Sequence, residues 1–414
     1  MRKYGNCSIS MCRDMAVSAM HVVPGVENLG SQQAFNASSR QHGRDARVTI
    51  EHRDRQPALL PYARCLITTL LCFAGLLRAD AVPSATMSSA TRREAFLKII
   101  DRPKVDPAPE AKLESTIAGI ARYHFTYASE AGQRVPGILM MKESFATDGK
   151  KHPVIIAAHG TGGSKDGELG LLKRLAEKDF IAVAIDGRYH GERGKSADYN
   201  GAIAKAFEKG GEHPLYYDTV WDIMRLIDYL QTRPDVAADR IGLIGFSKGG
   251  IETWLTAAAD PRVAVAVPCI GVQSFQWALE NDAWHARVAT VQKGFTAAAK
   301  SAGVDNPDPA FVRKFYDRVL PGIYSTFDGP KMLPLISPRP LLTINGDGDD
   351  KNPLPGLKLC TDAAKAAYAG DGAIDKFVSI IEPNTGHSVN ADSMTAAVDW
   401  FSKWIGDGAK GDGR

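Results

Sequence analysis

The stretch Arg240-Ile-Gly-Leu-Ile-Gly245-Phe246-Ser247-Lys248-Gly249-Gly250-Ile251-Glu-Thr-Trp-Leu255 joins a short apolar run to a segment with helical spacing. Its centre, residues 245–249, matches the pattern G-x-S-x-G. A turn that leads from a strand straight into a helix is pinched, so a side chain two positions before or after the serine would clash. Such a turn lifts the Ser247 hydroxyl off the sheet and places it at a helix N-terminus, where free N–H groups favour negative charge. The stretch therefore predicts a strand, a sharp turn that exposes a nucleophile, and a helix, rather than an ordinary glycine-rich turn.

Short apolar runs alternate with helical patterns along most of the chain. The apolar runs are 154–158, 180–185, 240–245, 263–267, 340–344 and 377–382. The helical patterns are 169–178, 217–231, 251–259, 363–369 and 394–405. Runs that are apolar throughout are typical of parallel strands buried on both faces, and their alternation with helices predicts an α/β fold with a mostly parallel central sheet and helices on both faces. Two alternating runs, 123–129 and 134–141, predict an antiparallel hairpin at the front edge of the sheet.

One connection is much longer than this alternation requires. About seventy residues lie between Val267 and Pro340, where a helix of about a dozen residues would be enough. They are rich in aromatic side chains and have mostly helical patterns. Because ligands bind at the carboxyl ends of strands in such folds, we expect a helical cap insertion, about residues 271–335, over a pocket. Extra packing is the alternative interpretation.

The N-terminal region has the signature of a secretory signal peptide. Arg64 precedes an apolar run, residues 65–77, and Ala79-Asp80-Ala81 resembles a cleavage site. The run is too short to span a bilayer. We therefore expect a leader, 1–81, and a secreted or periplasmic product whose start codon was assigned too far upstream; a buried or interfacial helix is the alternative.

The rest of the chain divides into three parts. A linker with a short helix near 92–100 occupies 82–119, the catalytic domain occupies 120–406, and a tail occupies 407–414.

Charge and cysteine content exclude several classes of function. Residues 1–81 contain ten Lys/Arg and six Asp/Glu, so this leader has a net charge of +4 and the remainder of the chain −1. A near-neutral body lacks the basic surface of a nucleic-acid-binding protein or the polybasic cluster of a membrane-associated one. No Cys/His cluster suggests a zinc site. The body contains only Cys269 and Cys360, which could form one bridge or remain free.

A serine nucleophile needs a general base, and chain order narrows the choice. In this type of fold the order is serine, acid, histidine. Only His285 and His387 follow Ser247. His387 follows the last predicted strand and has Gly386 before it, whereas His285 lies in the insertion without a strand behind it. We therefore predict that His387 is the base.

Three carboxylates follow the strand at 340–344 and could orient that base. They are Asp347, Asp349 and Asp350. The acid holds the histidine in the required tautomer and stabilises the imidazolium. We predict Asp349, with Asp350 and Asp347 as alternatives. A Ca²⁺ site is a competing interpretation, but the segment lacks the spacing and the later Glu of an EF-hand.

Two backbone N–H groups should stabilise the oxyanion. We predict the amide of Lys248, directly after the nucleophile, and that of Thr161 in the turn His159-Gly-Thr-Gly-Gly163. This turn does not match a phosphate-binding glycine motif. The polar stretch 186–193 follows another strand and favours structural ion pairs; its His190 precedes Ser247 and so does not fit the order expected of a base.

Taken together, these motifs resemble those of the α/β-hydrolase superfamily, and more narrowly the dienelactone-hydrolase, acetyl-xylan-esterase and prolyl-oligopeptidase-like branch. The resemblance covers about residues 120–406 and implies that Ser247, Asp349 and His387 form a catalytic triad. Dienelactone hydrolases have Cys where this chain has Ser247, which favours an esterase. Prolyl oligopeptidases usually carry an N-terminal β-propeller, for which this chain has no room.

The expected activity is hydrolysis of a carboxylic ester through an acyl-serine intermediate, with no metal or organic cofactor. The partner would be a small-molecule or polymer-borne ester. The alternatives are a serine peptidase of the prolyl-oligopeptidase-like type and a non-catalytic hydrolase-fold binding protein. The sequence does not reveal the oligomeric state.

Overall fold

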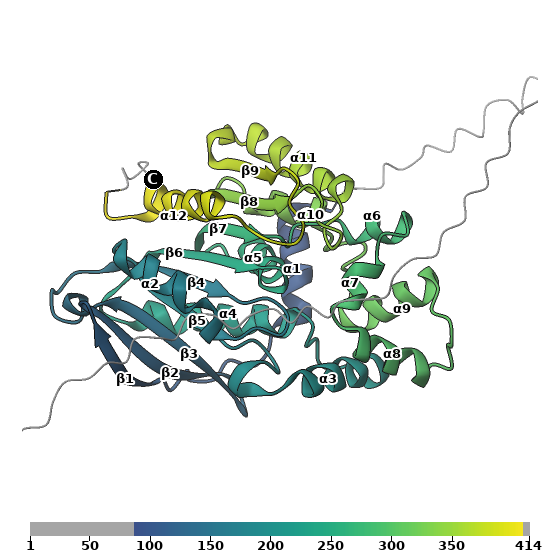
Figure 1. Ribbon diagram of the computed structural model, residues 1–414, viewed down its shortest axis with the longest axis horizontal. Helices are drawn as coiled ribbons and strands as arrows, with labels where there is room; N and C mark the ends of the chain where they lie inside the picture. Colours follow the sequence, from purple (N-terminus) through teal and green to yellow (C-terminus); the bar gives the residue numbers. More distant parts are fainter. Residues whose placement is uncertain (1–86, 409–414) are drawn as a thin grey trace, which may run out of the picture. The chain divides into compact units, whose positions relative to one another are not determined.

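A nine-stranded sheet organises residues 87–408, which the computed structural model describes (Figure 1). The strand order is β1-β2-β3-β5-β4-β6-β7-β8-β9, and β4 to β9 are parallel while β1, β2 and β3 are antiparallel at one edge. The strands are β1 Glu110–Ile117, β2 Ile120–Glu130, β3 Gln133–Lys142, β4 His152–Ala158, β5 Ile181–Ile185, β6 Val236–Phe246, β7 Val263–Cys269, β8 Leu341–Gly346 and β9 Phe377–Glu382. The mostly parallel sheet and the β2–β3 hairpin confirm the predictions, except that β1, and not the hairpin, forms the edge of the sheet.

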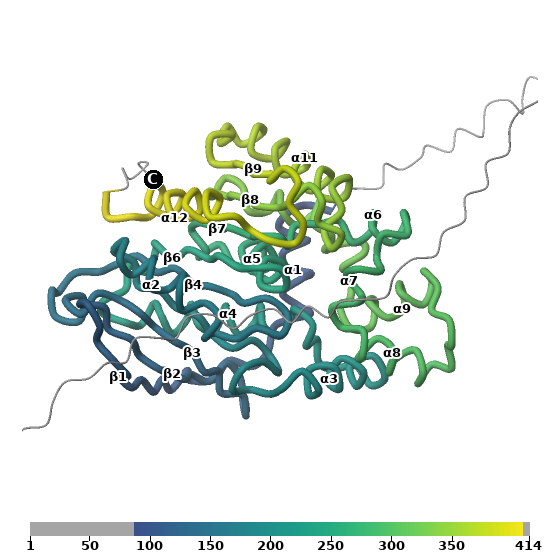
Figure 2. Tube along the Cα trace, viewed as in Figure 1, coloured from purple at the N-terminus to yellow at the C-terminus, as the bar shows by residue number. Residues whose placement is uncertain are grey.

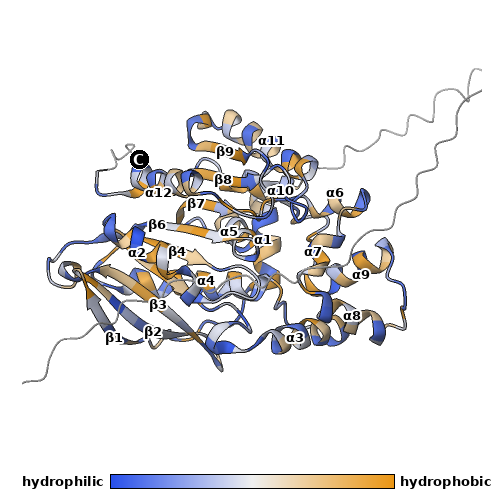
Figure 3. Ribbon diagram, in the orientation of Figure 1, coloured by the Kyte–Doolittle hydropathy of each residue, from blue (hydrophilic) through white to orange (hydrophobic). Residues whose placement is uncertain are grey.

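Helices bury both faces of the sheet, as β4 shows. Its Val154 and Ile156 belong to one hydrophobic cluster and its Ile155 and Ala157 to another, because successive side chains of a strand point to opposite faces. Helices α1 (Ser89–Ile100), α4 (Tyr217–Thr232) and α5 (Lys248–Ala259) contribute to the first cluster, and α2 (Leu169–Glu177) and α12 (Ala391–Ile405) to the second. Figure 3 shows the apolar colouring of β7 and β8 between these layers.

Two elements were absent from the sequence prediction. Residues 82–119, predicted as a linker and a helix, also contain the edge strand β1. This strand is exposed and has no apolar pattern in its sequence, and it is held in the sheet by its pairing with β2. Helix α3 (Ser196–Lys209) buries Tyr199, Ile203 and Phe207, whose four-residue spacing is a helical signal that could have identified it. Helix α11 (Leu354–Gly370) includes the predicted segment but begins nine residues earlier.

The long connection after β7 is helical, as expected. It contains α6 (Phe275–Glu280), α7 (His285–Ala289), α8 (Gln292–Ser301), α9 (Pro309–Val319) and α10 (Gly329–Met332). Helix α8 lies beside α3 (Figures 1 and 2), where the Gly294 amide donates a 2.8 Å hydrogen bond to Asn200 Oδ1. A Cβ on Gly294 would lie only 3.0 Å from the Asn200 carbonyl oxygen, so glycine permits this close helix pairing. The role of the insertion as a cap stays a prediction.

Several predictions fall outside the described residues. The leader 1–81 and most of the tail 407–414 lie there, so export stays a prediction. Between residues 87 and 408, no helix has both the length and the apolar character required to cross a membrane. Cys269 and Cys360 are buried free thiols, so they form no bridge with each other.

Candidate active site

Ser247 occupies a strained turn between β6 and α5. Its backbone φ of 54° lies in the left-handed region, which costs a residue other than glycine free energy. The Ser247 amide donates to the Cys269 carbonyl oxygen at 3.0 Å, and α5 begins at the next residue. The turn therefore holds a serine side chain at the carboxyl end of a central strand and at a helix N-terminus, as the motif predicts.

The glycines around Ser247 are required by close backbone approaches. A Cβ on Gly245 would lie 2.3 Å from the Gly249 carbonyl oxygen, and one on Gly249 would lie 2.0 Å from the Ala158 carbonyl oxygen. Neither backbone atom can move without displacing a strand or helix. The close packing of backbone atoms therefore explains why the motif has glycine at both of these positions.

The structure brings the three predicted triad residues into one hydrogen-bonded line. His387 Nε2 lies 2.8 Å from Ser247 Oγ, and His387 Nδ1 lies 2.8 Å from Asp349 Oδ2. An ionised carboxylate only accepts, so Nδ1–H donates to Asp349 and Nε2 is left to accept the serine proton. Asp349 follows β8 and His387 follows β9, so the three groups come from the carboxyl ends of three parallel strands.

The loops that carry the acid and the base are tied to each other. The amide of Gly348 donates to the Thr385 carbonyl oxygen at 3.0 Å, and the Thr385 amide donates to Asp347 Oδ1 at 3.2 Å. A Cβ on Gly346 would lie 2.1 Å from the Thr385 carbonyl oxygen. Glycine in the Asn-Gly-Asp-Gly-Asp segment therefore lets the histidine loop approach.

Of the three candidate acids, only Asp349 is buried and reaches the histidine. Asp347 and Asp350 are exposed; the first accepts from the Thr385 amide and the second pairs with Lys351 Nζ at 3.2 Å. The three carboxylates thus face different partners and do not converge, as ligands of a single Ca²⁺ would have to.

Asp349 is held in its ionised form. Burial raises its pKa, but hydrogen bonds from His387, from Asn352 Nδ2 at 2.6 Å and from the Lys351 amide at 2.9 Å outweigh this, and the net pKa is lowered. An ionised acid is the form that can stabilise a developing imidazolium.

A chain of hydrogen bonds connects Asp349 to the insertion through Asn352. Asn352 is fully buried and donates its other amide hydrogen to the Ile270 carbonyl oxygen at 2.8 Å. Its Oδ1 accepts from Arg287 Nη2 at 2.6 Å, and the same Nη2 donates to the Lys351 carbonyl oxygen at 3.0 Å. Arg287 belongs to α7, so the insertion positions the acid loop. The sequence prediction missed both residues; Asn352 lies three positions after Asp349, whereas no local signal marks Arg287.

The two predicted oxyanion donors belong to the two segments that adjoin the nucleophile. The amide of Lys248 begins α5, and Thr161 lies in the turn after β4. A Cβ on Gly160 would lie 3.6 Å from Ser247 Cβ, so this turn passes directly beside the nucleophile. Neither the Lys248 nor the Thr161 amide donates to another described residue, which leaves both N–H groups available to a ligand.

The side chain of Lys248 makes a separate, fully buried ion pair. Its Nζ donates to Glu252 Oε1 one turn along α5, and both side chains are about 1% exposed. Burial raises the pKa of Glu252 to about 7, although the Lys248 charge opposes this. A buried pair is costly to break from one side, because the remaining charge has no counter-ion.

Removing one partner of this pair should therefore destabilise the protein strongly. We expect Glu252→Gln to lower the free energy of unfolding by about 3–5 kcal/mol, measured by urea denaturation, because it strands the Lys248 ammonium. The double variant Lys248→Met/Glu252→Leu should recover most of the loss. Glu177→Gln, which removes an exposed partner of Lys173, should change stability by less than about 1 kcal/mol. Equal losses for the two single variants would contradict this account of the pair.

The stretch 186–193 forms ion pairs, as predicted. Asp186 pairs with Lys165 Nζ at 2.9 Å, and Arg188 and Arg193 both contact the fully buried Asp222, at 3.0 and 2.6 Å. His190 does not contact the triad; its Nδ1 lies 2.7 Å from the Arg188 carbonyl oxygen.

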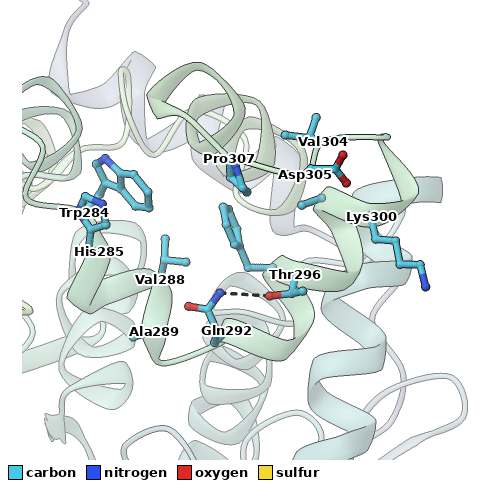
Figure 4. Close-up of a pocket in the computed structure, with 12 residues that line it drawn as sticks. Trp284, His285, Val288, Ala289, Gln292, Thr296, Lys300, Val304, Asp305 and Pro307 are labelled. Atoms are coloured by element: carbon cyan, nitrogen blue, oxygen red, sulfur yellow. Dashed lines mark hydrogen bonds between the residues drawn. The ribbon is translucent and has the colours of Figure 1, made fainter.

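His285, the alternative base, lies in a different pocket. This pocket of about 760 Å³ is formed entirely by insertion residues, and Figure 4 shows Trp284, Val288 and Pro307 around it, with Gln292 bonded to Thr296. His285 stacks on Trp284 with ring centroids 3.7 Å apart and is largely exposed. None of the triad residues lines this pocket, which agrees with the choice of His387 as base.

Comparison with known proteins shows a likeness to esterases. The profile of the family described as acetyl xylan esterase (AXE1) matches residues 98–282, which include Thr161, Ser247 and Lys248 but not Asp349 or His387. YtaP of Bacillus subtilis is 28% identical over 266 residues, which are 61% of this chain and 79% of YtaP.

Solved structures extend the likeness over a larger part of the chain. The crystal structure of acetyl xylan esterase 1 from Thermoanaerobacterium sp. JW/SL YS485 has a TM-score of 0.53 and 19% identity, and covers 76% of this chain and 92% of that one. Acetyl xylan esterase from Paenibacillus sp. R4 has a TM-score of 0.55 and 17% identity, over 77% and 95%. At such identities the likeness shows a shared fold.

Proposed function

We propose that this chain, which has the α/β-hydrolase fold and resembles acetyl xylan esterases, is a serine esterase that hydrolyses carboxylic esters. The observation that carries the proposal is the continuous Ser247–His387–Asp349 hydrogen-bonded line. Such a line activates a hydroxyl that is otherwise a weak nucleophile.

In the proposed mechanism, Ser247 Oγ attacks the ester carbonyl carbon while His387 Nε2 takes the hydroxyl proton. The ionised Asp349 stabilises the imidazolium through Nδ1–H. The Lys248 and Thr161 amides donate to the oxyanion, where fixed donors act at the moment that charge develops. His387 then gives its proton to the leaving alcohol, and water hydrolyses the acyl-serine by the same steps in reverse.

An ester substrate is favoured over a peptide by the match to the acetyl xylan esterase family around the nucleophile. A binding protein without activity has no need for a buried, ionised Asp349 aligned on a histidine, since buried charges are costly to keep. The occupied triad therefore supports an enzyme over the non-catalytic alternative.

A panel of substrates tests the proposal. We expect the protein to hydrolyse p-nitrophenyl acetate faster than peptide p-nitroanilides, and a fluorophosphonate probe to label Ser247 covalently, as read by mass spectrometry of the peptide. Ser247→Ala should carry no label. Faster cleavage of the anilides would support the peptidase instead, and labelling at another serine would refute the assignment of the nucleophile.

A further inference from the structure

A second pocket adjoins the candidate active site. Its volume is about 540 Å³, and it is lined by the turn after β4, the loop after β5, the start of α3 and Thr290 of the insertion. Thr161 in its wall follows Gly160, whose Cβ position would be 3.6 Å from Ser247 Cβ. This volume lies within the range of small-molecule sites. The pocket is therefore placed to hold the part of an ester substrate that extends beyond the reacting carbonyl.

One histidine of this pocket has a ring nitrogen that makes no hydrogen bond to a described residue. His190 is 4% exposed, and its Nδ1 donates to the Arg188 carbonyl oxygen at 2.7 Å. Because Nδ1 carries the hydrogen, Nε2 of the neutral ring has a free lone pair. Among residues 87–408, no group donates to this Nε2, although the ring lines the pocket.

The ring is fixed in place by its neighbours. Tyr199 of α3 packs edge-on against it at 4.5 Å between ring centroids, and the His159 ring centroid lies 5.0 Å away. Tyr199 is itself anchored through its hydroxyl to the Leu215 carbonyl oxygen at 3.2 Å. His190 is therefore held as a rigid feature of the pocket wall.

His190 is also kept neutral. Its pKa is lowered to about 3, chiefly by burial and also by the charges of Lys248 and of a protonated His159, although the Arg188 carbonyl and Asp186 oppose this. At the pH of any ordinary assay the ring therefore acts as an acceptor at Nε2. A carboxylate placed there would be repelled, because its oxygen lone pairs would face the lone pair of Nε2, whereas a hydroxyl group could donate a hydrogen bond to Nε2.

We propose that His190 is a specificity-determining residue whose Nε2 accepts a hydrogen bond from a hydroxyl on the alcohol portion of the ester. This inference rests on the proposed esterase function. Thr161, Ser164 and Thr290, whose side chains carry hydroxyls, line the same pocket, together with Lys195.

Two substitutions distinguish the role of His190 Nε2 as an acceptor from the role of Nδ1 in the hydrogen bond to the Arg188 carbonyl oxygen. In His190→Asn, the side-chain amide can still donate to the Arg188 carbonyl oxygen, but the Nε2 acceptor is gone. In His190→Gln, the longer amide reaches the Nε2 position and can accept there. The substrates are glycerol monoacetate, which has two free hydroxyls, and its di-O-methyl ether, which has none; acetate release is followed in a pH-stat.

We expect His190→Asn to lower kcat/KM for glycerol monoacetate about tenfold, and to leave the di-O-methyl ether and p-nitrophenyl acetate unchanged. His190→Gln should restore part of the loss. Equal effects of His190→Asn on all three esters, or no effect on any, would overturn the inference while leaving the esterase proposal intact. Failure of the wild-type protein to hydrolyse any ester would instead refute the proposed function, and the inference with it. Circular dichroism and the melting temperature of each variant show whether it is folded.

Discussion

Replacing Ser247 by alanine is expected to lower kcat for p-nitrophenyl acetate hydrolysis by about six orders of magnitude. The reason is that His387 Nε2 lies 2.8 Å from Ser247 Oγ, and alanine removes the hydroxyl that this nitrogen activates. The amides of Lys248 and Thr161 would remain, so a small rate above that of water should persist. Because the three triad groups act as a unit, His387→Ala should cost about as much, and the double variant little more than either single one.

A matched control keeps this test specific. Ser402→Ala removes a hydroxyl that bonds within α12, to the Val398 carbonyl oxygen at 3.0 Å, and should retain wild-type kcat. Both variants should unfold at similar urea concentrations. A Ser247→Ala protein with more than a few per cent of wild-type activity, free of contaminating enzyme by active-site titration, would exclude the proposed nucleophile.

Replacing Asp349 by asparagine is expected to lower kcat by about four orders of magnitude, with a smaller change in KM. Asparagine occupies the same space but can donate to His387 Nδ1, which favours the tautomer with its hydrogen on Nε2. That tautomer cannot accept the Ser247 proton. Steady-state kinetics on p-nitrophenyl acetate measure the effect.

Asp350→Asn is the matched control, since it is the same chemical change one residue along the same loop. Asp350 is exposed and pairs with the neighbouring Lys351, so its replacement should leave kcat close to the wild-type value. A large loss in Asp350→Asn together with full activity in Asp349→Asn would transfer the role of the acid to the alternative that the sequence left open.

The fold class and the location of the nucleophile could be predicted from local patterns. Continuous apolar runs specify strands that are buried on both faces. Strand β4 is an example, because its side chains belong to two hydrophobic clusters, one on each face of the sheet. Glycines around Ser247 specify a turn that no other residue could make, because their Cβ atoms would meet backbone. Chain order then left His285 and His387, and the predicted strand before His387 favoured it as the base. The edge strand β1 has no such pattern, since its pairing with β2 is a tertiary contact.

The sequence by itself was enough to identify the nucleophile and the base, because each is marked by residues within a few positions of it. Only the tertiary structure decided which of Asp347, Asp349 and Asp350 reaches the histidine, since the three lie within four residues and differ only in the direction of their side chains. The same holds for contacts between distant segments: Arg287 reaches Asn352 from 65 residues away, and His190 meets the turn after β4 only in the folded chain. Local backbone preferences are carried by neighbouring residues, whereas convergence of side chains depends on how the strands are ordered in the sheet.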